Sequence, residues 1–158
     1  QNAQHKSLQR LLRLYQASAG IFLGHDPNQQ QQYLSPEASQ RQPVEVMIEL
    51  WCSDTAFKLI SEGTPRFPWQ QVKMSQPFNR DLMRTNWSIF SLRKTPDSNF
   101  SHRFRVYLPQ WSLQDIDLHR WILGLGGEAK VVKPDHLREE LERKGQAIVQ
   151  AMTMTSNE

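Results

Sequence analysis

Three side chains on one predicted strand carry the clearest chemistry in this sequence. Arg103, Arg105 and Tyr107 alternate with apolar residues between positions 104 and 108. Because successive side chains of a strand point to opposite faces, two guanidinium groups and a phenol should share one surface. Arginine binds phosphate in a bidentate manner, and both residue types stack on bases, so the trio suits single-stranded nucleic acid. The alternative is an exposed strand that its charges keep soluble and unpaired.

The positive charge of the chain is concentrated around these residues. The formal net charge is only +3, but positions 66–105 contain eight cationic residues and only two acidic residues, both aspartates. These cationic residues are Arg66, Lys73, Arg80, Arg84, Arg93, Lys94, Arg103 and Arg105. Such a stretch gains from phosphate neutralisation and counterion release, although charge alone equally indicates a solvated face. The predicted nucleic-acid-binding or anion-binding residues are Arg93, Lys94, Arg103, Arg105 and Tyr107.

Hydrophobic periodicity predicts the elements that position them. In chain order we expect a helix over 6–18, a strand over 44–51, a helix after Ser53, strands over 87–92 and 103–108, a helix from Ser112, a strand over 129–132 and a terminal helix. The strands over 87–92 and 103–108 should form an antiparallel hairpin. This β-α-β-β-α-β order predicts an α+β fold of the ferredoxin-like type, with an N-terminal helix arm and an added C-terminal helix. The free face of such a sheet commonly binds a partner sheet, a ligand or bases.

The helix from Ser112 shows how local the signals are. Ser112 is the expected N-cap, and Asp115 three residues later nearly completes a capping box. Leu118, Trp121 and Ile122 begin an apolar stripe along one side of the helix. We expect this helix to pack through its stripe and to end at the glycines that follow.

Composition predicts the domain organisation. With 158 residues, the chain is long enough for one domain with an appended arm. We expect residues 1–24 to form an entry helix and turn that lead from a missing upstream domain. Residues 25–43 are rich in Gln, Asn, Ser and Pro, which predicts a flexible polar linker. Residues 44–152 should form the folded domain, and residues 153–158 a disordered tail.

Catalytic and metal-binding patterns find little support in the sequence. The five histidines are dispersed without metal-ligand spacing, and we expect them at the surface. They are His5, His25, His102, His119 and His136. Cys52 is the only cysteine, so we expect a buried structural thiol rather than a nucleophile. No enzyme activity, cofactor or metal is therefore predicted. The lack of a long apolar run or a leader predicts a cytoplasmic protein without membrane contact.

The last third of the chain resembles a known regulator family. Residues 121–126 read Trp-Ile-Leu-Gly-Leu-Gly, residues 131–134 read Val-Val-Lys-Pro, and residues 137–138 open a terminal helix with Leu-Arg. This order resembles the C-terminal extension of the WYL-domain transcription regulators. The run from Ile21 to Gly24 is also similar to the turn through which that extension is entered. The Trp-Tyr-Leu triplet and the DNA-reading helix-turn-helix of the family do not occur, so the resemblance implies a fragment of a longer bacterial regulator.

The resemblance implies a regulatory module rather than a catalyst. In the family, the extension supports dimerisation, and some members respond to single-stranded DNA held beside it. We therefore expect a homodimer, a single-stranded DNA or nucleotide-type effector, and contact with operator DNA only through the missing N-terminal domain. One alternative is a plain interaction or dimerisation module without a ligand. Another is an RNA-recognition-like domain, although the expected core motif of that class is missing.

Overall fold

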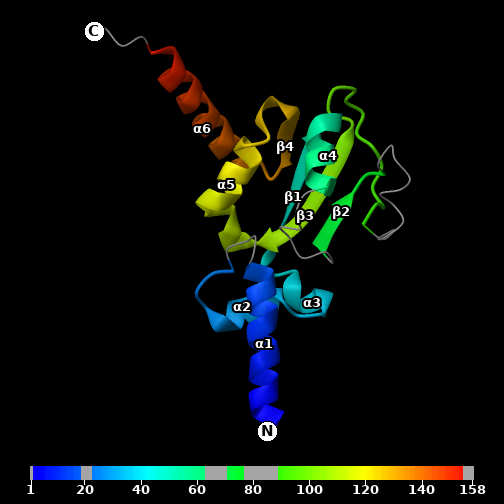
Figure 1. The fold of residues 1–158 in the computed structure, drawn as a ribbon, viewed down its shortest axis with the longest axis vertical. Coiled ribbons are helices and arrows are strands. Elements are labelled where there is room, and N and C mark those ends of the chain that lie inside the picture. Colours follow the sequence, from blue (N-terminus) through cyan, green and yellow to red (C-terminus); the bar gives the residue numbers. More distant parts are fainter. Residues whose placement is uncertain (1, 19–22, 63–70, 77–88, 155–158) are drawn as a thin grey trace.

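A four-stranded antiparallel sheet forms the centre of the computed structural model, which describes residues 2–18, 23–62, 71–76 and 89–154. Its strands in these residues are β1 (Glu45–Cys52), β2 (Val72–Met74), β3 (His102–Pro109) and β4 (Ala129–Lys133). They lie side by side in the order β2-β3-β1-β4. Helix α4 (Asp54–Glu62) connects β1 to the β2 side, and α5 (Ile116–Leu123) lies between β3 and β4 in the chain (Figure 1). The predicted α+β class and antiparallel sheet are confirmed.

The two central strands, β1 and β3, alternate as the sequence predicts. Leu50 pairs with Phe104 and Ile48 with Val106, and all four side chains are buried. Since period-two alternation places every second residue on one face, these residues form the apolar face of the sheet. Burial of this face, at about 25 cal/mol per Å² of apolar surface removed from water, is the main source of stability here.

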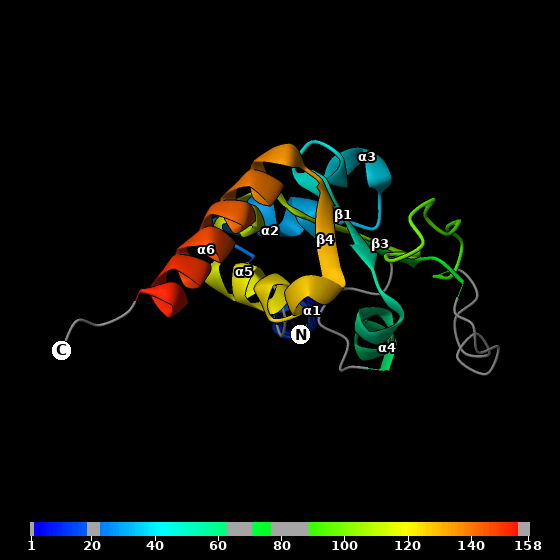
Figure 2. The ribbon, with the colours of Figure 1, turned by 90° about the horizontal axis from the view of Figure 1, so that it is seen from above.

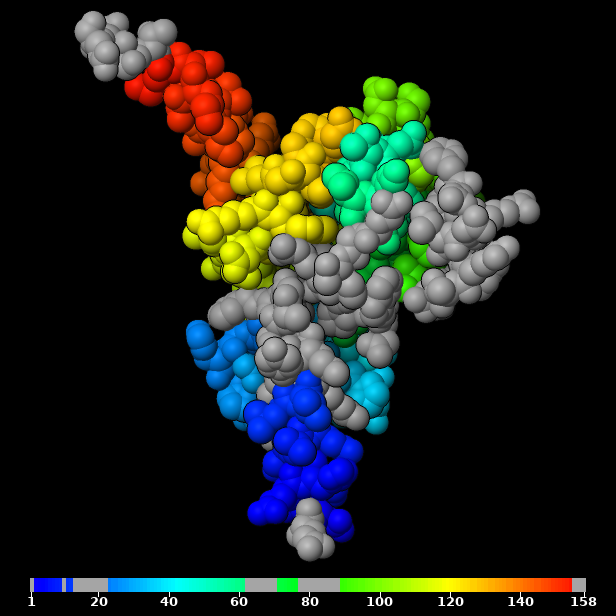
Figure 3. Space-filling view, in the orientation of Figure 1, coloured from blue at the N-terminus to red at the C-terminus, as the bar shows by residue number. Residues whose placement is uncertain are grey.

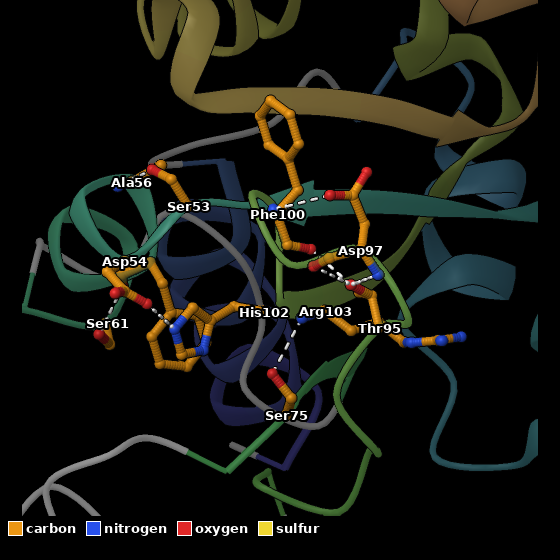
Figure 4. A network of polar contacts seen from close by, with 11 residues as sticks. Ser53, Asp54, Ala56, Ser61, Ser75, Thr95, Asp97, Phe100, His102 and Arg103 are labelled. Carbon is orange, nitrogen blue, oxygen red and sulfur yellow. Dashed lines mark hydrogen bonds and ion pairs between the residues drawn. The ribbon is translucent and has the colours of Figure 1, made fainter.

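Helix α4 packs on this apolar face. The Ser53 hydroxyl accepts a hydrogen bond from the Ala56 amide at 3.2 Å, which confirms the predicted cap. Phe57 stacks on the His102 ring with 4.2 Å between ring centroids. His102 Nε2 lies 2.6 Å from Asp54 Oδ1, so the first turn of the helix is tied to the start of β3 (Figure 4).

One predicted strand is wrong. Residues 87–88 lie outside the described residues, and residues 89–91 are not in a strand; only Leu92 makes an isolated bridge, to Ser75. The strand that pairs with β3 is β2, in which Val72 and Met74 are buried and Lys73 faces the other way. The sequence shows an apolar-polar stretch near residues 70–75, but three alternating residues are too few to assign it as the strand beside β3. The segment 78–85 lies outside the described residues as well.

The structure also corrects the predicted flexible linker at 25–43. This segment forms two short helices, α2 (Pro27–Tyr33) and α3 (Ala38–Arg41). Asp26 caps α2 through the Asn28 amide at 2.9 Å, and Tyr33 is completely buried. Its hydroxyl donates to the Tyr107 carbonyl oxygen at 2.9 Å. The contact joins two residues that lie 74 positions apart in the chain. Buried Tyr33 therefore ties to the sheet a segment whose polar composition predicts a flexible linker.

A third corrected prediction concerns how α5 begins. Asp115, not Ser112, is the N-cap, and its carboxylate accepts from the Asp117 amide at 3.3 Å. Ser112 is buried in the short 3₁₀ turn Gln110–Gln114 that precedes the helix. The predicted stripe is confirmed, since Leu118 and Ile122 are buried and Trp121 packs on the core. The helix begins later than predicted because Ser112 lies inside the 3₁₀ turn, whereas Asp115 directly precedes the first helical residue.

Two of the five histidines are buried, contrary to the prediction that all lie at the surface. His102 and His119 are each 1% exposed. His119 Nε2 lies 2.5 Å from the Leu113 carbonyl oxygen, so Nε2 carries the proton and donates. His119 Nδ1 then accepts from Lys144 Nζ at 2.6 Å. A histidine that links α5 to the following helix is thus part of the packing. Cys52, by contrast, is buried as predicted, and burial raises the pKa of its thiol to about 12.

The terminal helices extend away from the sheet. Helix α6 (Asp135–Thr153) buries Leu137 and Leu141, but Ile148 is 48% exposed and Met152 83% exposed. Its last turns project from the body of the molecule (Figure 3). Helix α1 (Asn2–Ser18) forms as predicted and lies at the opposite end (Figure 1). Residues 19–22 and 155–158, where the entry turn and most of the tail were predicted, lie outside the described residues.

Candidate nucleic-acid interface

The second face of the sheet, called the polar face below, carries the predicted site. It consists of the side chains that alternate with the apolar face: Glu45, Met47, Glu49 and Trp51 on β1, Arg103, Arg105 and Tyr107 on β3, Lys73 on β2 and Lys130 on β4. Register brings Trp51 opposite Arg103 on one side and Lys130 on the other. The next position brings Glu49 opposite Arg105, whose other neighbour is Lys73. Four aligned strands therefore gather cations around Glu49 and Trp51.

Glu49 is the centre of this arrangement. Its side chain is only 3% exposed, and Oε1 accepts hydrogen bonds from Arg105 Nε and from an Arg103 terminal nitrogen at 3.4 Å. The other carboxylate oxygen, Oε2, accepts from the Trp51 indole at 3.2 Å. A buried charge is tolerated only when it is paired and hydrogen-bonded, and here three donors supply both.

The protonation of Glu49 follows from these contacts. Burial raises the pKa of the carboxyl group, but the hydrogen bond and charge of Arg105, the indole hydrogen bond and the charge of Arg103 outweigh it. The net pKa is therefore below the ordinary glutamate value. Glu49 is ionised at neutral pH, and the Arg-Glu-Arg group keeps a net charge of +1.

Trp51 lies between two cations. The Arg103 guanidinium carbon is 5.7 Å from the centroid of its ring, and Lys130 Nζ is 5.2 Å away. Both distances lie within the range of cation–π attraction. The indole is partly exposed, so an aromatic surface and two positive charges meet on the polar face near the Cys52 end of β1.

A structured loop holds Lys130 at one edge. Lys130 Nζ lies 2.8 Å from an Asp97 carboxylate oxygen and 5.0 Å from the centroid of the Phe100 ring. Asp97 also accepts from the Phe100 amide, while the Thr95 hydroxyl donates to the Phe100 carbonyl at 2.6 Å (Figure 4). The hydrogen bond from Lys130 lowers the pKa of Asp97 first, and the loop amides add to it. The loop thereby presents Phe100 beside Lys130.

The structure separates the five predicted site residues into two groups. Arg103, Arg105 and Tyr107 share the polar face, as alternation predicts. Arg93 and Lys94 are exposed in the segment that follows Leu92, which runs outside β2 at the edge of the sheet. The backbone hydrogen bonds from Leu92 to Met74 and from Thr95 to Ser101 flank them, so this segment leads from β2 to the residues just before β3. The Tyr107 carbonyl oxygen accepts from the Tyr33 hydroxyl, so α2 contacts this end of β3. Helices α3 and α4 lie on opposite sides of the sheet (Figure 2).

Sequence reasoning missed four residues of this site: Glu49, Trp51, Phe100 and Lys130. Glu49 and Trp51 alternate with the core residues of β1, so the period assigns them to the polar face. Which cations they contact depends on register, because 54 and 56 residues separate Glu49 from the two arginines. The proximity of Phe100 to Lys130 has no local signal at all.

The residues that the structure describes contain no group of three or more His, Cys, Asp or Glu side chains placed to hold a metal ion. No helix in the same residues has the length and apolar character that crossing a membrane requires.

Comparison with known proteins finds one match, which lies in the last third of the chain. Residues 114–149 match the family model of the WCX domain. The match spans α5, β4 and most of α6, so Lys130 falls inside it, whereas Glu49, Trp51, Arg103 and Arg105 do not. Neither the curated proteins nor the solved structures contain a match to this chain. Residues 114–149, 36 of the 158 residues, are thus similar to the WCX domain, the C-terminal domain of WYL-domain regulators.

Proposed function

We propose that this chain is the C-terminal regulatory domain of a WYL-type transcription regulator and that its polar face binds a single-stranded nucleic-acid effector. The observation that carries this proposal is the row Arg103–Trp51–Lys130, in which an indole lies between two cations. Domains that bind single strands combine a positive surface along the backbone with aromatic rings on which bases stack. In this proposal the domain is a cytoplasmic binding module, not an enzyme, and other parts of the regulator contact operator DNA.

Single strands fit the polar face better than a duplex does. Bases of a single strand are free to stack on Trp51, while the bases of a duplex are already stacked on one another. Arg103 and Arg105 supply donors for the phosphates, and Lys130 adds a second positive edge. The sheet order β2-β3-β1-β4 and the element order β-α-β-β-α-β further support a ferredoxin-like plan, in which one sheet face is commonly the binding surface.

Fluorescence anisotropy with a labelled single-stranded oligonucleotide and its duplex tests the proposal at low and near-physiological salt. The test variant is Arg103→Gln/Lys130→Gln, which removes the two charges beside Trp51. The matched control is Lys58→Gln/Arg143→Gln, which removes two exposed charges from α4 and α6. We expect at least about a tenfold loss of single-strand affinity for the test variant and little change for the control. Equal losses, or no binding by the wild type at near-physiological salt, would contradict the proposal.

A second candidate function has its own observation. The last turns of α6 expose Ile148, Val149 and Met152, which are 48%, 60% and 83% exposed. Contiguous exposed apolar residues mark interaction surfaces. If the chain is a plain dimerisation module, sedimentation velocity will show a concentration-dependent dimer that Ile148→Ser/Met152→Ser abolishes. In that case oligonucleotides will not bind in a salt-dependent manner.

A further inference from the structure

A buried acid at the centre of a surface that binds a polyanion is unexpected from charge alone. Glu49 cancels one of the positive charges that would attract phosphate, and its burial carries a desolvation cost. Apolar residues of similar volume often stabilise a protein as well as a buried ion pair does. The geometry of Glu49 therefore calls for a role in the site that an apolar residue would not provide.

The contacts of Glu49 indicate that role. Its Oε1 is shared by Arg103 and Arg105, and its Oε2 holds the Trp51 indole. A guanidinium has five N–H donors in a fixed planar fork, and Glu49 engages one nitrogen of each arginine. Each guanidinium is thereby fixed in orientation while donors are left for another acceptor. The Arg103 and Arg105 side chains are 20% and 29% exposed, so part of each guanidinium side chain remains open to solvent.

We propose that Glu49 is a positioning residue: it holds the two guanidinium groups and the indole in one fixed arrangement, so that adjacent phosphates and a base of a single strand meet them together. This inference rests on the proposed function. Ordering flexible side chains before binding lowers the entropy that binding must overcome. Without Glu49, Arg103 and Arg105 keep their charges but lose their common orientation.

The proposal makes a prediction opposite in sign to simple electrostatics. Glu49→Gln removes a negative charge, which by charge alone strengthens the binding of any polyanion. If Glu49 positions the arginines, the same substitution weakens binding. Glu45 provides a matched control, because it lies on the same strand and face and contacts Arg41 at 3.9 Å instead of the site arginines. Glu45→Gln makes the same change of charge.

The experiment measures single-stranded DNA affinity at neutral pH for the wild type, Glu49→Gln and Glu45→Gln, with far-UV circular dichroism as a check of folding. We expect Glu49→Gln to bind about tenfold more weakly and Glu45→Gln to bind equally or more tightly. A methylphosphonate oligonucleotide of the same sequence, whose backbone is neutral, supplies a readout that separates positioning from general damage. The neutral oligonucleotide should bind more weakly than the charged one, because it offers no phosphate charge to the arginines. Its affinity should be the same for the wild type and for Glu49→Gln.

A second variant covers the case in which Glu49→Gln does not fold. Arg105→Lys keeps the charge and the pair with Glu49 but loses the planar fork, and we expect several-fold weaker binding of the charged strand. Tighter or unchanged binding by Glu49→Gln, or unchanged binding by Arg105→Lys, would overturn the positioning role while leaving the proposed function intact. Absence of wild-type binding would remove the proposed function, and this inference with it.

Discussion

The two faces of β1 and β3 use the same backbone in different ways. On the apolar face, Ile48, Leu50, Phe104 and Val106 are all buried, and each has several apolar neighbours. On the polar face, Glu49 alone joins Arg103, Arg105 and Trp51. Close packing spreads the loss of one side chain over many contacts. A hydrogen-bonded ion network instead depends on whether every member keeps a partner.

The largest expected effect compares the faces directly. Leu50→Ala removes a fully buried side chain, and we expect it to lower the free energy of unfolding by about 2–5 kcal/mol. Met47→Ala, on the same strand but on the partly exposed face, should cost less than about 1.5 kcal/mol. Urea unfolding of both variants measures the two values. Equal losses would mean that the polar face is packed as tightly as the core.

The next effect concerns the network. Arg105→Ala leaves the buried Glu49 with two donors instead of three, and we expect a loss of about 2 kcal/mol. Because the cost comes from an incompletely paired charge, Glu49→Gln/Arg105→Ala should recover part of it. A double-mutant cycle by urea unfolding gives the coupling energy. Additive losses would show that the two side chains contribute independently.

A smaller effect separates the two glutamates of the polar face by pH. The pKa of Glu49 is below the ordinary value of 4.5, so its contribution is complete above that pH and is lost as pH falls through the lowered pKa. Burial raises the pKa of Glu45, and the charge of Arg41 offsets part of that rise. Its neutral form therefore favours the folded state, and stability decreases as pH rises from 4.5 through the raised pKa.

Urea unfolding between pH 3.5 and 6 measures both effects. Relative to the wild type, Glu49→Gln should flatten the rise of stability just below pH 4.5, while Glu45→Gln should remove a decrease just above it. The same sign for both variants would contradict the different environments of the two carboxyl groups.

The smallest expected effect on stability lies at the edge of the polar face. Lys130 is 44% exposed, and its ion pair with Asp97 is open to solvent. We expect Lys130→Ala to change the free energy of unfolding by less than about 1 kcal/mol, because exposed ion pairs contribute little. Thermal unfolding measures this change. A larger loss would show that Lys130 holds the loop of Phe100 as a structural element and not only as a surface cation.

The sequence by itself determined the features that depend on short-range periodicity. Alternation assigned Arg103, Arg105 and Tyr107 to one face and predicted β1, β3 and β4. Helical spacing located the helices that flank the sheet, and the family resemblance in the last third of the chain agrees with the WCX match. These signals are local because one backbone conformation fixes the direction of each successive side chain.

Only the tertiary structure decided which side chains meet. Glu49 is joined to arginines 54 and 56 residues away, and Tyr33 to a carbonyl 74 residues away. Tertiary contacts also accompany the helices α2 and α3 where a linker was predicted, and β3 pairs with Val72–Met74. A side chain's own neighbours in sequence do not specify such pairings. They follow from strand register and from the requirement that each buried polar group find a partner.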